Sequence, residues 1–128
     1  MKAADVLEYS EPTFVPPSMT ILEVAKLMID MRVDSVLVRS GSKVLGVVTE
    51  HDIVKALALG KPLTEQVSEI MSRNIIVARR DEPLSSIVNK MLEANIRHLP
   101  VLSDDGSIVG VLNIKDVLRA FSAFSSWP

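Results

Sequence analysis

The sequence predicts an α/β protein made of two tandem, pseudo-symmetric β-α-β-β-α repeats that pack through their sheets. A short motif occurs twice, as GVVTEHD at residues 46–52 and as GVLNIKD at residues 110–116. The chain before each motif also aligns, because ILEVAKLMIDMRVDSVLV (21–38) matches LSSIVNKMLEANIRHLPV (84–101) in its apolar positions. We therefore place the first repeat at residues 1–62 and the second at residues 63–128.

Composition limits the class of protein. The chain has 128 residues, of which 48% are hydrophobic and 4% aromatic, so an aliphatic core is expected and disorder is excluded. Cysteine is absent, which excludes disulfides and cysteine metal sites. The net charge is −2 without any long basic run, which argues against nucleic acid as a partner. No stretch reads as a signal peptide or a membrane span, which predicts a cytoplasmic protein without membrane contact.

Each repeat should contain a first helix with one apolar face. In the first repeat this face has helical spacing at Ile21, Val24, Met28 and Met31. Thr20 and Glu23 have the spacing of a capping box, which predicts a helix start at residue 21. In the second repeat, we expect Pro83 at the first helical position.

A β-hairpin and a second helix should follow each first helix. Residues 35–48, SVLVRSGSKVLGVV, are two β-rich runs around a Ser-Gly turn. Residues 99–112, LPVLSDDGSIVGVL, have the same form around an Asp-Gly turn. The second helix begins at the end of each hairpin, within the repeated motif.

The repeated T-x-x-D and N-x-x-D patterns have two interpretations. Thr49 and Asn113 suit the N-cap of the second helix, and Asp52 and Asp116 at the third helical position can return a hydrogen bond. A helix start after a strand also exposes backbone N–H groups that bind anions. In this functional interpretation, the hydroxyl holds a phosphate or sugar oxygen and the aspartate accepts hydrogen bonds from a vicinal diol. The sequence alone leaves both interpretations open.

The order and spacing of these motifs resemble a known family. GVVTEHDI following MRVDSVLV, and GVLNIKDV following NIRHLPVL, are similar to the two halves of a CBS-domain pair, or Bateman module. The resemblance covers roughly residues 3–123. It implies two pseudo-symmetric clefts, assembly into a homodimer, and binding of adenosine compounds such as AMP, ADP, ATP, S-adenosylmethionine or NAD. Members of this family regulate partners and are not themselves catalysts.

The resemblance also assigns residues to each cleft. In the first cleft, Asp52 should accept the ribose hydroxyls, Thr49 should hold a ribose or phosphate oxygen, and the basic side chains should face the phosphate. Its full predicted set is Thr49, Asp52, Ile76, Arg97, His98, Leu99 and Pro100. The second cleft takes Thr13, Ser35, Asn113, Lys115 and Asp116. It departs from the family pattern because Asn113 replaces threonine and Asp34 stands where the other half has Arg97. We expect the first cleft to bind a phosphorylated adenosine, and the second cleft to bind weakly, to stay empty or to suit a neutral adenosyl group.

The sequence therefore predicts a regulatory sensor of adenine nucleotides that acts through ligand-dependent rearrangement of a CBS homodimer. It should be no enzyme and should require no cofactor and no metal. The alternatives are a ligand-free dimerisation scaffold and a binder of S-adenosylmethionine or NAD. The aromatic tail AFSAFSSWP suits either packing on the module or docking of an unidentified protein partner.

Overall fold

A computed structural model describes residues 1–6 and 12–124, without the side chains of residues 123 and 124. The predicted role of Trp127 lies outside these residues. The chain divides into two compact units, described separately below. The first unit is Thr13–Ile75, and the second unit combines Met1–Pro12 with Ile76–Pro128.

The first unit contains the elements of the first repeat. They are β1 (Phe14–Val15), α1 (Ile21–Met31), β2 (Ser35–Ser40), β3 (Lys43–Thr49), α2 (Glu50–Ala58) and the 3-10 turn η3 (Val67–Glu69). The sheet has the order β1-β2-β3, in which β1 runs parallel to β2 and β3 runs antiparallel to it.

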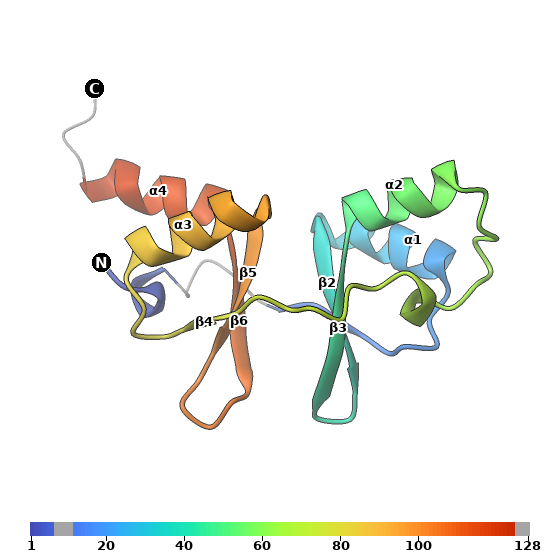
Figure 1. Ribbon diagram of the computed structural model, residues 1–128, viewed down its shortest axis with the longest axis horizontal. Helices are drawn as coiled ribbons and strands as arrows, with labels where there is room; N and C mark the ends of the chain where they lie inside the picture. The colour runs from blue at the N-terminus through green and yellow to red at the C-terminus, as the bar shows by residue number, and fades with distance from the viewer. Residues whose placement is uncertain (7–11, 125–128) are drawn as a thin grey trace. The chain divides into compact units, whose positions relative to one another are not determined.

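The second unit repeats this arrangement. It contains η1 (Ala3–Asp5), β4 (Ala78–Arg79), α3 (Leu84–Ala94), β5 (His98–Leu102), β6 (Ile108–Asn113) and α4 (Ile114–Phe124). Its sheet has the order β4-β5-β6 with the same strand directions (Figure 1). The predicted mixed α/β class with a β-α-β-β-α order in each repeat is therefore confirmed.

The first helices begin and end at the expected places. The Thr20 hydroxyl accepts the Glu23 N–H at 3.1 Å, and the Glu23 carboxylate accepts the Thr20 N–H at 3.2 Å, which confirms the capping box. Arg32 and Asn95 close α1 and α3 in matching left-handed conformations, with φ of 55° and 53°. The prediction for Pro83 is wrong by one position, because it is the N-cap of α3 and its extended backbone precedes the helix.

Each unit has its own aliphatic core between helices and sheet. In the first unit the core consists of Val15, Val24, Met28, Val36, Val38, Val48, Val67 and Met71. In the second unit it consists of Ala3, Val6, Ala78, Leu84, Ile87, Met91, Leu99, Val101, Leu112, Val117 and Ala120. Met31, which the spacing places on the same apolar face, lies outside this core: its side chain is 55% exposed, because Met31 is the last residue of α1 and lies beyond the part of the helix that packs.

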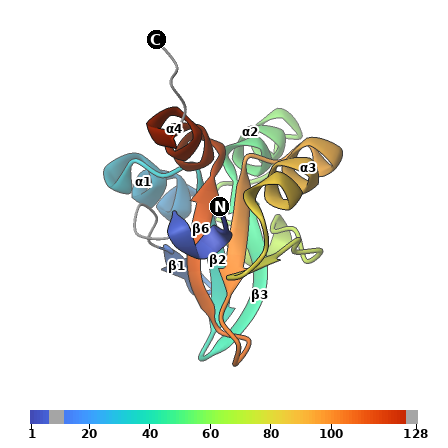
Figure 2. The ribbon, with the colours of Figure 1, turned by 90° about the vertical axis from the view of Figure 1, so that its left-hand side faces the viewer.

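Both hairpins contain the predicted glycine turns. Gly41, with φ of 60°, and Ser42 join β2 to β3, which is the glycine-first geometry of a type II′ turn. Gly106 has φ of 87° in the longer second loop. Both hairpins also shift register at equivalent places, after Val38 and after Val101. The closed ends of the hairpins point away from the helices of their units (Figures 1 and 2).

The segments that precede the two repeats are exchanged. In the first unit, residues 63–67 of the linker pair with the start of α1, where Ile21 N–H donates to the Glu65 carbonyl at 2.9 Å. Val67 N–H donates to the Met19 carbonyl at 2.8 Å, and the Val67 side chain enters the first core. The linker that leads into the second repeat therefore belongs structurally to the first unit.

The N-terminus makes the equivalent bonds in the second unit. Leu84 N–H donates to the Met1 carbonyl, and Ala3 N–H donates to the Glu82 carbonyl, both at 2.9 Å. Ala3 is fully buried in the second core. As a result, the compact units do not follow the boundary that we place between residues 62 and 63 from the sequence alone. That boundary divides the two sequence repeats and not the two compact units.

The repeated glycine has a structural role in the first unit. The backbone of Ser72 pairs with β3 next to Gly46: Val47 N–H donates to the Ser72 carbonyl and Ser72 N–H donates to the Val47 carbonyl, each at 2.9 Å. A Cβ on Gly46 would lie 2.7 Å from the Ser72 carbonyl oxygen and 2.8 Å from the Met71 sulfur. Glycine is therefore required by the close approach of the linker backbone.

We expect Gly46→Ala to lower the free energy of unfolding by about 1–3 kcal/mol, because the added methyl group overpacks against backbone that cannot move freely. Urea denaturation measures this loss. Ser40→Ala, an exposed change in the same hairpin, is the control and should change stability little. Equal stability of the Gly46→Ala variant and the wild type would contradict the structural role of the glycine.

Candidate functional site

The turn between β3 and α2 positions the first predicted aspartate. The Asp52 carboxylate accepts the Thr49 N–H at 2.8 Å and the Thr49 hydroxyl at 3.2 Å, both through Oδ2. Thr49 pairs with Ser35 across the hairpin, and Glu50 N–H donates to the Asp34 carbonyl at 3.1 Å. The capping interpretation is thus correct for both positions, because Thr49 is the N-cap residue of α2 and Asp52 accepts its N–H, while the Thr49 hydroxyl donates to the aspartate.

The turn between β6 and α4 has the same layout in the second unit. The Asp116 carboxylate accepts the Asn113 N–H at 3.2 Å through Oδ2. The Asn113 side-chain oxygen accepts the Lys115 N–H at 2.8 Å, so the asparagine side chain caps the helix. Asn113 pairs with His98 across the hairpin, as Thr49 pairs with Ser35.

The remaining residues predicted for the first cleft lie in the second unit. Ile76 is half-buried and packs against the second core, and the Arg97 carbonyl accepts the Ile114 N–H at 2.9 Å. Leu99 is fully buried within that core, so its side chain supports the site by packing. Because side chains alternate along β5, His98 and Pro100 lie on the opposite face of the strand from Leu99. Both are buried.

Two of the residues predicted for the second cleft lie in the first unit. The Thr13 carbonyl accepts the Leu37 N–H at 2.8 Å, which extends the pairing of β1 with β2. Ser35 begins β2 and is half-buried. Each predicted cleft therefore draws residues from both units, and their combination into clefts stays a prediction.

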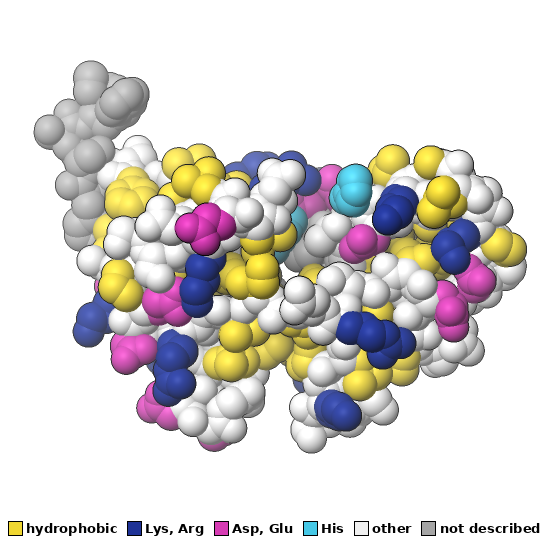
Figure 3. Space-filling model, viewed as in Figure 1, with side chains coloured by type: hydrophobic (Ala, Val, Ile, Leu, Met, Phe, Trp, Pro, Cys, Tyr) yellow, Lys and Arg dark blue, Asp and Glu magenta, His cyan; other side chains and the backbone are white. Residues whose placement is uncertain are grey.

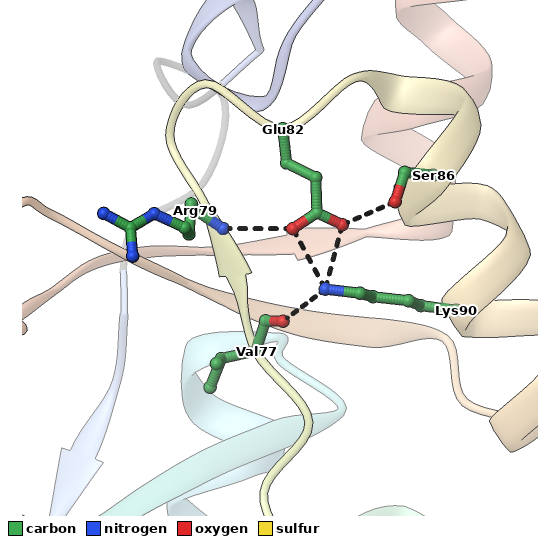
Figure 4. A network of polar contacts seen from close by, with 5 residues as sticks. All are labelled: Val77, Arg79, Glu82, Ser86 and Lys90. Carbon is green, nitrogen blue, oxygen red and sulfur yellow. Dashed lines mark hydrogen bonds and ion pairs between the residues drawn. The ribbon is translucent and has the colours of Figure 1, made fainter.

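A polar network that the sequence analysis missed supports the irregular segment between Ile76 and β4. The Lys90 ammonium donates to the Val77 carbonyl at 2.9 Å and forms an ion pair with Glu82 at 2.9 Å (Figure 4). The Ser86 hydroxyl donates to Glu82 at 2.8 Å. In the first repeat, apolar residues stand at the positions of Glu82 and Lys90, and this departure from the repeat is the signal that the sequence offered.

The network changes the proton affinity of Glu82. Partial burial raises the pKa of this carboxyl, but hydrogen bonds from Lys90, Ser86 and the Arg79 N–H outweigh burial, so the pKa lies below the ordinary value of 4.5. A folded-state pKa below the unfolded one stabilises the fold above the unfolded pKa. This contribution is lost as the pH falls through the folded-state value.

We expect Lys90→Met to lower the free energy of unfolding at pH 7 by about 1–2 kcal/mol, because Glu82 loses a charged hydrogen-bond partner at a half-exposed site. The difference from wild type should shrink as the pH falls below 4.5, because the unfolded state then binds a proton that Glu82 in the folded wild type still resists. Urea denaturation at pH 7 and pH 3.5 measures both effects.

The first repeat supplies a control for the Lys90 experiment. It has Met19 and Leu27 at the positions of Glu82 and Lys90, and both pack against the first core. The double variant Glu82→Met/Lys90→Leu should therefore recover part of the stability that Lys90→Met loses. A stability difference that is the same at both pH values would contradict the role of the ion pair.

In residues 1–6 and 12–124, no three histidine, cysteine, aspartate or glutamate side chains group closely enough to hold a metal ion. None of the helices in this part of the chain has the length and apolar character of a membrane span. On the face drawn in Figure 3, acidic and basic side chains are interspersed over both units.

Comparison with known proteins identifies the class. The chain matches the CBS domain family twice, at residues 3–59 and 67–123. It therefore belongs to the CBS domain family, as the repeated motifs indicated. CBS domain pairs are typically regulatory. The fold matches the solved CBS domain pair of protein MJ0100, in complex with 5′-methylthioadenosine and S-adenosyl-L-methionine, with a TM-score of 0.87 and 31% identity over 98% of each chain.

Two further proteins are similar to this chain. The AMP complex of the CBS domain protein PAE2072 from Pyrobaculum aerophilum matches with a TM-score of 0.83 and 28% identity, over 96% of this chain and 99% of that one. The L-aspartate semialdehyde sulfurtransferase of Methanocaldococcus jannaschii is 35% identical over 111 residues, which are 86% of this chain. The matched part is 21% of the sulfurtransferase, so the likeness concerns a fifth of that protein.

Proposed function

We propose that this CBS domain pair is a regulatory module that binds an adenosine-containing ligand such as AMP, ADP or ATP. The observation that carries the proposal is the repeated, hydrogen-bonded aspartate at a strand-to-helix turn in both units. Relatives with the same fold support it, because one is in complex with AMP and another with 5′-methylthioadenosine and S-adenosyl-L-methionine.

The chemistry of the proposed site is recognition without catalysis. Asp52 accepts hydrogen bonds from the ribose diol, and its orientation is already fixed by Thr49. Ile76 and Pro100 contact the adenine ring, and Arg97 and His98 face the phosphate of a nucleotide. The module needs no cofactor or metal and acts in the cytoplasm.

Regulation follows from differential affinity. A ligand that binds one arrangement of the units or protomers more tightly increases the population of that arrangement. In a homodimer this shift changes the surface offered to a regulated protein partner. The same proposed site accepts S-adenosylmethionine or NAD, because each contains the adenosine whose ribose the aspartate recognises.

A ligand-free dimerisation scaffold is the second candidate, and exposed apolar side chains on the helices favour it. On the described helices and at the C-cap of α2, large apolar side chains are exposed at Leu22, Ile29, Met31, Val54, Leu57, Leu59, Leu92, Leu118 and Phe121. Apolar surface of this kind often marks an interface. A scaffold would use that surface without binding any ligand.

We expect a selective rise in melting temperature with one or more adenosine compounds. A ligand at 100 times its dissociation constant adds about 2.7 kcal/mol to the free energy of unfolding, which raises the melting temperature by several degrees. The measurement compares AMP, ADP, ATP, S-adenosylmethionine, 5′-methylthioadenosine and NAD at millimolar concentration, with GMP as the control for the base. No rise with any of the six would favour the scaffold.

Asp52→Ala separates sensor from scaffold. Loss of a hydrogen bond to a charged group costs about 1.5–3 kcal/mol, so the affinity for the best ligand should fall about ten- to a hundredfold. Isothermal titration measures the affinity, and sedimentation measures the oligomeric state. Asp30→Ala, an exposed change on α1, is the control. An unchanged affinity in the Asp52→Ala variant would remove Asp52 from the site.

A further inference from the structure

The two equivalent aspartates differ in what holds them. Both hydrogen bonds of Asp52 end on Oδ2, and Oδ1 has no partner among the described residues. Asp116 uses both oxygens: Oδ2 accepts the Asn113 N–H, and Oδ1 lies 3.4 Å from an Arg119 guanidinium nitrogen. The Asp116 side chain is 11% exposed and that of Arg119 is 64% exposed.

The residue that matches Arg119 in the first repeat behaves differently. Lys55 follows Asp52 by three positions, as Arg119 follows Asp116. Within the part of the chain that the structure describes, the Lys55 ammonium forms no ion pair with Asp52. The repeat therefore preserves a positive charge at this position, but only the arginine contacts the aspartate.

We propose that Arg119 makes the two adenosine sites unequal, because it occupies the Asp116 oxygen to which a ribose diol would donate. This inference rests on the proposed function and assigns the stronger ribose contact to Asp52. A carboxylate oxygen has two lone pairs, so the unoccupied Oδ1 of Asp52 can accept hydrogen bonds from both hydroxyl groups of a ribose. At Asp116 the ligand must first displace the guanidinium, so Arg119 determines how the two sites share ligand.

The size of the effect follows from the exposure of the arginine. An ion pair with one exposed partner is weak, so its removal should tighten the second site about two- to fivefold. The probe should be 5′-methylthioadenosine, which has the ribose diol and no charged group. A nucleotide would confound the test, because Arg119 also attracts its phosphate.

The experiment isolates the second site by removing the first. Isothermal titration with 5′-methylthioadenosine compares wild type, Asp52→Asn, and the double variant Asp52→Asn/Arg119→Ala. A triple variant that adds Asp116→Asn locates the gained affinity. Asp52→Asn/Lys55→Ala is the matched control, because it removes the equivalent positive charge from the first unit. Thermal melting of each variant without ligand reports whether it is folded.

We expect Asp52→Asn/Arg119→Ala to bind the probe about two- to fivefold more tightly than Asp52→Asn. The triple variant should lose this gain, and the Lys55 control should not show it. Equal affinity with and without Arg119, including no measurable binding by either variant, would overturn it. Two equal sites in wild type would also overturn it. If wild type binds none of the adenosine compounds, the proposed function fails instead, which separates the two results.

Discussion

The exchanged backbone pairing at the start of the first helices is the constraint on which both units depend. Residues 65–67 close the entry to α1, and residues 1–3 close the entry to α3, through hydrogen bonds at equivalent positions. Each segment also inserts an apolar side chain, Val67 or Ala3, into the core that it covers. A repeat of about 60 residues buries little apolar area by itself. The exchange enlarges each core with chain from outside the repeat, so the linker is a structural element of the module.

This exchange explains why the first copy of the motif needs glycine. The linker continues from η3 along β3, where Ser72 forms two backbone hydrogen bonds with Val47. Any side chain at Gly46 would collide with that backbone. The motif therefore has two structural tasks: the glycine allows the close approach of the linker, and the aspartate six residues later fixes the start of α2. Only the aspartate is left with an oxygen for a ligand.

The sequence predicts the architecture well because its signals are local. Helical spacing, the Thr20–Glu23 capping box and the glycine turns depend on neighbouring residues, and the structure contains all of them. Predictions fail where contacts between residues far apart in the sequence decide the outcome. The exposure of Met31 depends on where the packing of α1 ends, and the grouping of residues 1–6 with the second repeat depends on long-range hydrogen bonds. No periodicity within a repeat contains that information.

The same distinction applies to the candidate site. The sequence identifies Asp52 and Asp116 as equivalent, because the motif repeats, but the equivalence of position hides a difference of environment. Asp52 is oriented by Thr49 through one oxygen, whereas Asp116 also contacts Arg119. Preorganisation by a hydrogen bond lowers the entropic cost of ligand binding, whereas a cation that competes for the carboxylate makes ligand binding less favourable. A duplicated motif can therefore retain one cap in both copies while its two carboxylates diverge in their capacity to bind ligand.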